Sequence, residues 1–111
     1  MQFRHSKLDD KTVVIEIESG DGGELVTLLD SRGHGFAVFG EVEFPFVVID
    51  GRLREEAWCT EAHMLAIEAH ELGHIHAQST DEPTAELAGI DILTKLDQRD
   101  AADILRGRGV I

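Results

Sequence analysis

Two histidines and a glutamate stand at a spacing that can bind a metal ion and activate water, in the segment His70-Glu71-Leu72-Gly73-His74. Residues four apart lie on the same side of an α-helix, so both imidazoles can reach one ion. Glu71 is rotated by about 100° from His70, so it can stand beside the ion without having to bind it. Two neutral imidazoles and a carboxylate suit Zn²⁺ with a fourth position left for water, whose proton a glutamate can accept. The motif therefore predicts a zinc centre with Glu71 as the general base.

The third metal ligand has to come from another part of the chain, which offers two glutamates four residues apart, Glu82 and Glu86. Pro83 is typical of the first turn of a helix, so it places Glu82 at the helix end nearest to the turn after His74. Glu86 would then lie one turn further along and could accept a hydrogen bond from a ligand imidazole. The short link after His74 favours Glu86 instead, and Asp81 is a weaker candidate. We predict Glu82 as the third ligand, with Glu86 as the alternative.

The second half of the chain is expected to be helical and to position these groups. Between Arg54 and about Ala77 the only helix-breaking residue is Gly73, which predicts one long helix that carries the motif. The segment QSTDEP ends this helix, and a second helix is expected from about Glu82 to Leu96. A short third helix is expected at 100–107, where Gly107 ends it.

The first half of the chain is expected to form a sheet. Residues 12–19 are rich in β-branched side chains and predict a strand, and residues 36–51 predict two short strands around Pro45. Residues 24–33 fit either a short helix or a further strand. We therefore expect a single α+β domain over residues 1–111, with a small N-terminal antiparallel or mixed β-sheet followed by the active-site helix and the glutamate helix.

This arrangement resembles the gluzincin zinc metallopeptidases, in which one helix carries HExxH and a following helix supplies a glutamate as the third ligand. In many gluzincins that glutamate begins an ExxxD-like pattern. The segment EPTAELAG (82–89) is similar to such a pattern, except that Glu86 stands where Asp or Asn is usual. The segment is also similar to that of the ImmA/IrrE-type peptidases, and the small size of the chain is similar to that of the minigluzincins. The resemblance covers roughly residues 46–97 and does not extend to residues 1–45.

The resemblance implies a minimal zincin-like fold and a zinc metalloendopeptidase that hydrolyses an extended segment of a peptide or protein substrate. It implies zinc ligands at His70, His74 and Glu82, with Glu71 as the general base. Two other interpretations of the same residues are a zinc-stabilised regulatory or binding module without turnover, and a zinc hydrolase of a small amide. An open, water-filled coordination position would favour catalysis, and a closed pocket would favour the small amide.

Further candidates concern the oxyanion and the substrate. The chain has no tyrosine, so His34 and His63 are the available imidazoles for stabilising an oxyanion; each is otherwise an ordinary polar residue of a turn or a helix. His76 lies away from the stripe of His70 and His74 and is not expected to bind the metal. We expect the substrate to pair with the strand FVVID (46–50), since a peptide in a shallow cleft gains affinity mainly by main-chain pairing with a sheet edge.

Composition limits the other partners. Twenty-two acidic residues against ten basic ones give a formal charge of −12, so we expect no nucleic acid partner, because phosphates would be repelled. A single cysteine excludes an internal disulfide. The first residues do not resemble a signal peptide, and no stretch approaches the ~20 apolar residues of a membrane span. The sequence thus predicts a cytoplasmic protein without a membrane partner.

Overall fold

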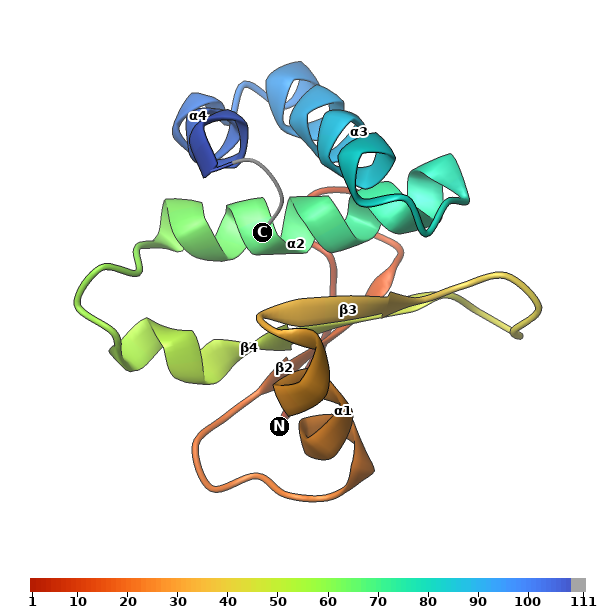
Figure 1. Ribbon diagram of the computed structural model, residues 1–111, viewed down its shortest axis with the longest axis vertical. Helices are drawn as coiled ribbons and strands as arrows, with labels where there is room; N and C mark the ends of the chain where they lie inside the picture. The colour runs from red at the N-terminus through yellow and green to blue at the C-terminus, as the bar shows by residue number, and fades with distance from the viewer. Residues whose placement is uncertain (109–111) are drawn as a thin grey trace.

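The computed structural model describes residues 1–108, in which a small β-sheet has α1 on one face and α2, α3 and α4 on the other (Figure 1). The α+β class expected from the sequence is confirmed. The elements follow in the order β1 (Gln2–His5), β2 (Val13–Ile17), α1 (Glu24–Arg32), β3 (Gly35–Val38), β4 (Phe46–Asp50), the 3₁₀ helix η1 (Gly51–Glu55), α2 (Glu61–Ala77), α3 (Glu82–Lys95) and α4 (Arg99–Arg108).

The sheet has the strand order β1-β2-β4-β3 and is mixed. β2 runs parallel to β4, with Val14 opposite Val47, while β1 pairs with β2 and β3 pairs with β4 in antiparallel register. Parallel neighbours require a crossover connection, and here α1 and β3 lie between β2 and β4 in the chain. As a result β4 is paired on both sides, and β3 forms one edge of the sheet.

The two central strands are buried on both faces, which explains why their sequences are continuous apolar runs. Alternate residues belong to different clusters because successive side chains of a strand point to opposite faces. The cluster shared with α2, α3 and α4 contains Val14, Val47 and Ile49. The cluster shared with α1 contains Ile15, Ile17 and Val48. The sheet is thus the middle layer between two apolar cores.

The start of the chain is attached to α2 through a buried carboxylate, Glu68, whose exposed fraction is 1%. The guanidinium of Arg4 donates to its Oε1 at 2.6 Å, and the Ser6 hydroxyl and the Lys7 amide donate to its Oε2 at 2.7 and 2.9 Å. A buried charge is tolerated when it is paired and fully hydrogen-bonded, as here. Glu68 therefore joins the first strand and the turn after it to the motif helix.

The motif helix begins later than the sequence predicted. The expected start at Arg54 is wrong, because residues 51–55 form a separate 3₁₀ helix. The side chain of Asp50 caps this 3₁₀ helix by accepting a hydrogen bond from the Arg52 amide. α2 starts at Glu61, after Thr60, whose side chain caps it. The predicted end at Ala77 is confirmed, and Gln78 follows in the left-handed conformation at φ 51°.

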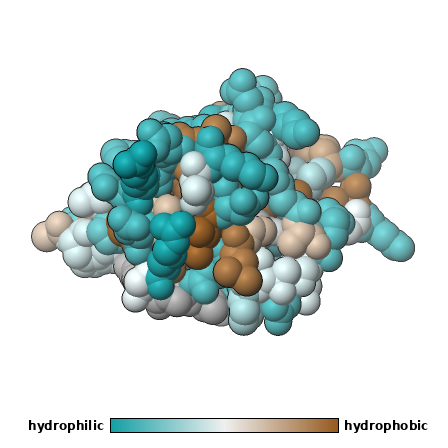
Figure 2. Space-filling view, turned by 90° about the horizontal axis from the view of Figure 1, so that it is seen from above, coloured by the Kyte–Doolittle hydropathy of each residue, from teal (hydrophilic) through white to brown (hydrophobic). Residues whose placement is uncertain are grey.

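The other helices lie where the sequence predicted them, but the expected end of the last helix at Gly107 is wrong, because α4 (Arg99–Arg108) continues through this glycine. α3 begins at Glu82, with the Asp81 side chain accepting a hydrogen bond from the Thr84 amide and Pro83 in the first turn. Residues 24–32 are a helix, so the alternative of a further strand there is excluded. Over residues 1–108 no helix combines the length and the apolar composition that crossing a bilayer requires. Viewed from the side of α3 and α4, the surface is largely hydrophilic with smaller apolar areas (Figure 2).

Candidate metal centre

Helix α2 holds the two motif histidines inside the protein. Its residues from Ala66 to Ile75 are all buried, because the sheet covers one side of the helix and α3 and α4 cover the other. The side chain of His70 is 1% exposed and that of His74 is 8% exposed. Both imidazoles are held by close packing, which restricts their rotation.

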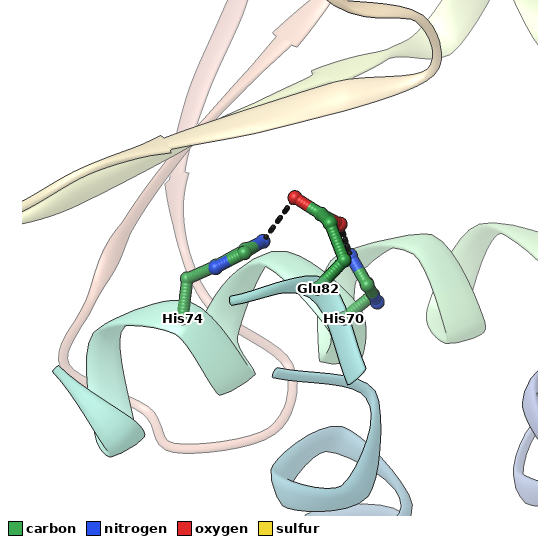
Figure 3. Close-up of side chains that lie close together, drawn as sticks. All are labelled: His70, His74 and Glu82. Atoms are coloured by element: carbon green, nitrogen blue, oxygen red, sulfur yellow. Dashed lines mark hydrogen bonds and ion pairs between the residues drawn. The ribbon is translucent and has the colours of Figure 1, made fainter. Parts of the chain in front are cut away.

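Three side chains converge at one point, two from α2 and one from the start of α3 (Figure 3). Nε2 of His70 lies 2.7 Å from Oε2 of Glu82, and Nε2 of His74 lies 3.1 Å from Oε1 of the same carboxylate. One ligand atom from each residue lies within 4.8 Å of the other two, so the group could hold a metal ion. The structure thus brings together the three residues predicted as ligands.

The tautomer of His74 follows from its other nitrogen. Nδ1 lies 2.7 Å from the carbonyl oxygen of Ser79, which can only accept a hydrogen bond, so Nδ1 carries the proton. In the neutral ring Nε2 then presents a lone pair towards Glu82. A lone pair and a carboxylate oxygen at 3.1 Å repel one another unless a positive charge lies between them or on the ring. The donor set therefore fits a divalent cation of the kind that imidazole and carboxylate ligands bind.

Helix α3 approaches α2 through two glycines, which brings Glu82 to the histidines. A methyl group at Gly73 would overlap the carbonyl oxygen of Ala85, and one at Gly89 would lie 2.7 Å from the carbonyl oxygen of Ala69. Backbone contact of this closeness requires glycine at both positions. The short link between the helices then leaves Glu82, in the first turn of α3, over the end of α2 that carries the motif.

The two other candidates for the third ligand lie outside the cluster. Asp81 caps α3, as its contact with Thr84 shows. Glu86 is half-buried and does not belong to the group that could hold a metal. The expected hydrogen bond from a ligand imidazole to Glu86 is not formed: Oε1 of Glu86 and Nδ1 of His70 are both buried and lack a partner among the described residues.

The carboxyl of Glu71 lies beside the cluster and is buried, with 6% exposed. Burial raises its pKa to about 8, the Glu82 carboxylate raises it as well, and Arg32 lowers it. A Cβ atom at Gly35 of β3 would lie 3.1 Å from Cγ of Glu71, so only glycine leaves this carboxyl its present space. Glu71 thus stands between the cluster and the edge of the sheet.

A cavity of about 360 Å³ opens over the cluster. The edge strand β3 and Phe39 line one side, and Glu71, His74 and Glu82 line the other. The ring of Phe39 stacks on His74, with centroids 6.3 Å apart and planes inclined by 19°. Our expectation that substrate pairs with β4 is wrong, because both edges of β4 are used within the sheet. The edge that faces the cavity belongs to β3.

The two imidazoles considered for oxyanion stabilisation lie elsewhere. His34 packs against Trp58, with ring centroids 6.2 Å apart, and does not line the cavity. Nδ1 of His63 accepts from the Thr60 amide at 3.2 Å, so this histidine completes the cap of α2. His76 is exposed and contacts Asp9, in agreement with its predicted exclusion from the ligands.

The cation that lines the cavity is Arg32, which the sequence analysis did not select. Its position, in the last turn of α1 and just before β3, was the available signal. The position of Arg32 points to the site only when β3 is known to be the edge strand beside the motif helix. A side chain carried by the preceding turn can then reach the cavity.

Comparisons of the chain with protein-family models, with curated proteins and with solved structures give no match. The function therefore has to be argued from the residues of the site itself.

Proposed function

We propose that this protein is a zinc-dependent peptidase of minimal gluzincin type. His70, His74 and Glu82 would hold the zinc, and Glu71 would be the general base. The observation that carries the proposal is the meeting of two imidazole nitrogens and a carboxylate within 4.8 Å of one another, on an HExxH helix and the helix that follows it. Zinc bound there would supply a Lewis acid that polarises the scissile carbonyl.

Each residue of the site has a distinct part in the hydrolysis. Ser79 fixes the protonated Nδ1 of His74 and so directs Nε2 towards the cluster. Glu71 accepts a proton from the attacking water and passes it to the leaving nitrogen. Its carboxyl is ionised when positive charge stands at the neighbouring cluster, because an opposite charge lowers the pKa of a carboxyl.

The shape of the site supports a peptide substrate over a purely structural metal. The cavity beside the cluster is bordered by β3, whose pairing within the sheet is with β4 alone. The outer edge of β3 offers main-chain groups to an extended peptide, which can add to the sheet as a further strand. Phe39 borders the same cavity as an apolar surface next to His74.

The proposal is tested by metal analysis and by hydrolysis of a peptide mixture followed by mass spectrometry. Protein purified without added metal should contain about one zinc per chain, since the motif supplies one site. Glu71→Gln should retain the zinc and lose hydrolysis, because the change removes the proton acceptor and leaves the imidazoles intact.

Glu24→Gln, on the exposed first turn of α1, is the matched control and should cleave like the wild type. Equal cleavage by the wild type and Glu71→Gln would refute the role of the base. Zinc without any cleavage would support the alternative of a zinc-stabilised regulatory or binding module.

A further inference from the structure

Arg32 differs from the other arginines whose side chains the structure describes. Each of those forms a salt bridge with a carboxylate; they are Arg4, Arg52, Arg54, Arg99 and Arg106. Arg32 is exposed, and it forms no hydrogen bond or salt bridge with any residue in the described part of the chain. The chain has 22 acidic and 10 basic residues, so the guanidinium of Arg32 remains available although carboxylates are in excess.

The acidic residue nearest to Arg32 in the sequence is held elsewhere. Oδ1 of Asp30 accepts from the Arg52 guanidinium at 2.6 Å, and Arg52 also binds Asp50 at 2.8 Å. The charge of Arg32 is therefore not neutralised by the helix that carries it. Arg32 is instead one of the residues that line the cavity over the candidate metal centre.

Within the cavity lining, the charged neighbours of Arg32 are the proposed general base Glu71 and the proposed ligand Glu82. Its field reaches Glu71, whose pKa it lowers against the larger effect of burial. Arg32 stands three residues before Gly35, the residue of β3 that adjoins Glu71. A peptide lying along β3 would therefore pass this guanidinium close to the base.

We propose that Arg32 binds a carboxylate of the substrate, so that the site selects peptides with an acidic group beside the scissile bond; this rests on the proposed peptidase function. A guanidinium binds a carboxylate through two parallel hydrogen bonds, which fixes direction as well as charge. The carboxylate can be an Asp or Glu side chain or the free C-terminus of the peptide. Both present the same planar group to Arg32.

The net charge of −12 does not oppose this selection at physiological salt. The Debye length is then about 8 Å, so carboxylates elsewhere on the surface are largely screened from a peptide in the cavity. The direct contact with Arg32 acts at hydrogen-bonding distance and is screened less. The charge of Arg32 thus decides the preference for acidic peptides, whereas the net charge of the protein affects the rate of encounter at low salt.

Binding of short synthetic peptides tests the proposal without requiring turnover. The peptides are of alanine and leucine with glutamate, glutamine or lysine at one central position, each with a free or an amidated C-terminus. Calorimetry on the zinc-loaded Glu71→Gln protein should give an affinity about ten-fold higher for the glutamate peptide than for the glutamine peptide. If Arg32 binds the terminal carboxylate instead, amidation of the C-terminus should lower the affinity by the same factor, and the central residue should have little effect.

The variants Arg32→Ala and Arg32→Lys, in the same background, assign the preference to this residue. Arg32→Ala should remove the difference between the paired peptides while leaving the affinity for the uncharged one nearly unchanged. Arg32→Lys should keep part of the preference, because it keeps the charge and loses the two-point contact. Arg99→Ala, on α4 and 84% exposed at its side chain, is the matched control and should behave as its parent.

Other outcomes would overturn the proposal: equal binding of charged and uncharged peptides, no binding of any peptide, or equal losses for all peptides in Arg32→Ala. In the wild-type background, an equal fall in kcat on every cleaved peptide would make Arg32 a transition-state group instead. If acidic peptides bind through Arg32 and none is cleaved, the peptidase proposal fails and the carboxylate site stands.

Discussion

The contact between α2 and α3 permits a quantitative test, because a single methyl group would separate the helices. A Cβ atom at Gly89 would lie 2.7 Å from the carbonyl oxygen of Ala69, whereas 3.4 Å is the start of ordinary van der Waals contact. Gly89→Ala therefore requires the backbones to move apart by about 0.7 Å, the difference between these distances. Neither atom belongs to a side chain that could rotate away.

Two opposing terms determine the free energy of unfolding of this variant. Overpacking of a core costs about 1–3 kcal/mol, and alanine is favoured over glycine within a helix by about 1 kcal/mol. Taking about 2 kcal/mol for the overlap, Gly89→Ala should lose about 1 kcal/mol of stability and lower Tm by about 4 °C. Gly73→Ala, whose overlap with Ala85 is more severe, should lose more.

Zinc affinity should fall together with stability, because Glu82 moves with α3 away from two histidines on α2. Ligand positions must hold to within about 0.5 Å, so we expect roughly ten-fold weaker binding in competition with a chelator. Gly107→Ala is the matched control: no atom of residues 1–108 lies within 4 Å of its Cβ position in α4, so it should stabilise the protein slightly and leave zinc binding unchanged. Wild-type stability and zinc affinity in Gly73→Ala would refute the account of the helix contact.

Three further predictions concern the ligands and the acid range. His74→Ala should lose the metal and lower Tm, since metal binding free energy is folding free energy; full zinc occupancy in elemental analysis would contradict the ligand assignment. Glu82→Ala should weaken zinc binding more than Glu86→Ala in chelator competition, because only Glu82 contacts the histidines; the reverse order would exchange their roles. The hydrogen bond from Arg54 lowers the pKa of Glu16 below its usual 4.5 in the folded protein. This pair therefore stabilises the fold above that pH and its contribution is lost as the pH falls through the lowered value. Glu16→Gln should accordingly flatten the dependence of Tm on pH below about 4.5, and an unchanged profile would refute it.

The parts of the site that could be predicted from the sequence are the local ones. The spacing of His70 and His74 fixes their common direction once a helix forms, and Pro83 fixes where the next helix starts. Together these features place Glu82 at the correct end of α3. The α+β class could likewise be predicted, since segments rich in β-branched residues precede the helical segments in the sequence.

The parts that could not be predicted depend on contacts between distant segments. The inward position of β4 follows from its parallel pairing with β2, which no local pattern encodes. The same pairing makes β3 the edge beside the motif helix, and only then does Arg32 become part of the site. The late start of α2 could not be predicted either, because Asp50 caps a separate 3₁₀ helix at 51–55 and Thr60 caps α2 itself.

The carboxylate of Glu68 has a consequence for how small this protein can be made. It lies two residues before His70 on the same helix, and its partners come from the first seven residues of the chain. A version trimmed to begin at β2 would leave a charge buried without partners, at a cost of about 3–5 kcal/mol. Truncation that begins after Lys7 should therefore prevent folding unless Glu68 is replaced by an apolar residue such as leucine. Strand β1 and the turn after it, although remote in sequence from the HExxH motif, therefore belong to the smallest folded unit that can carry this motif.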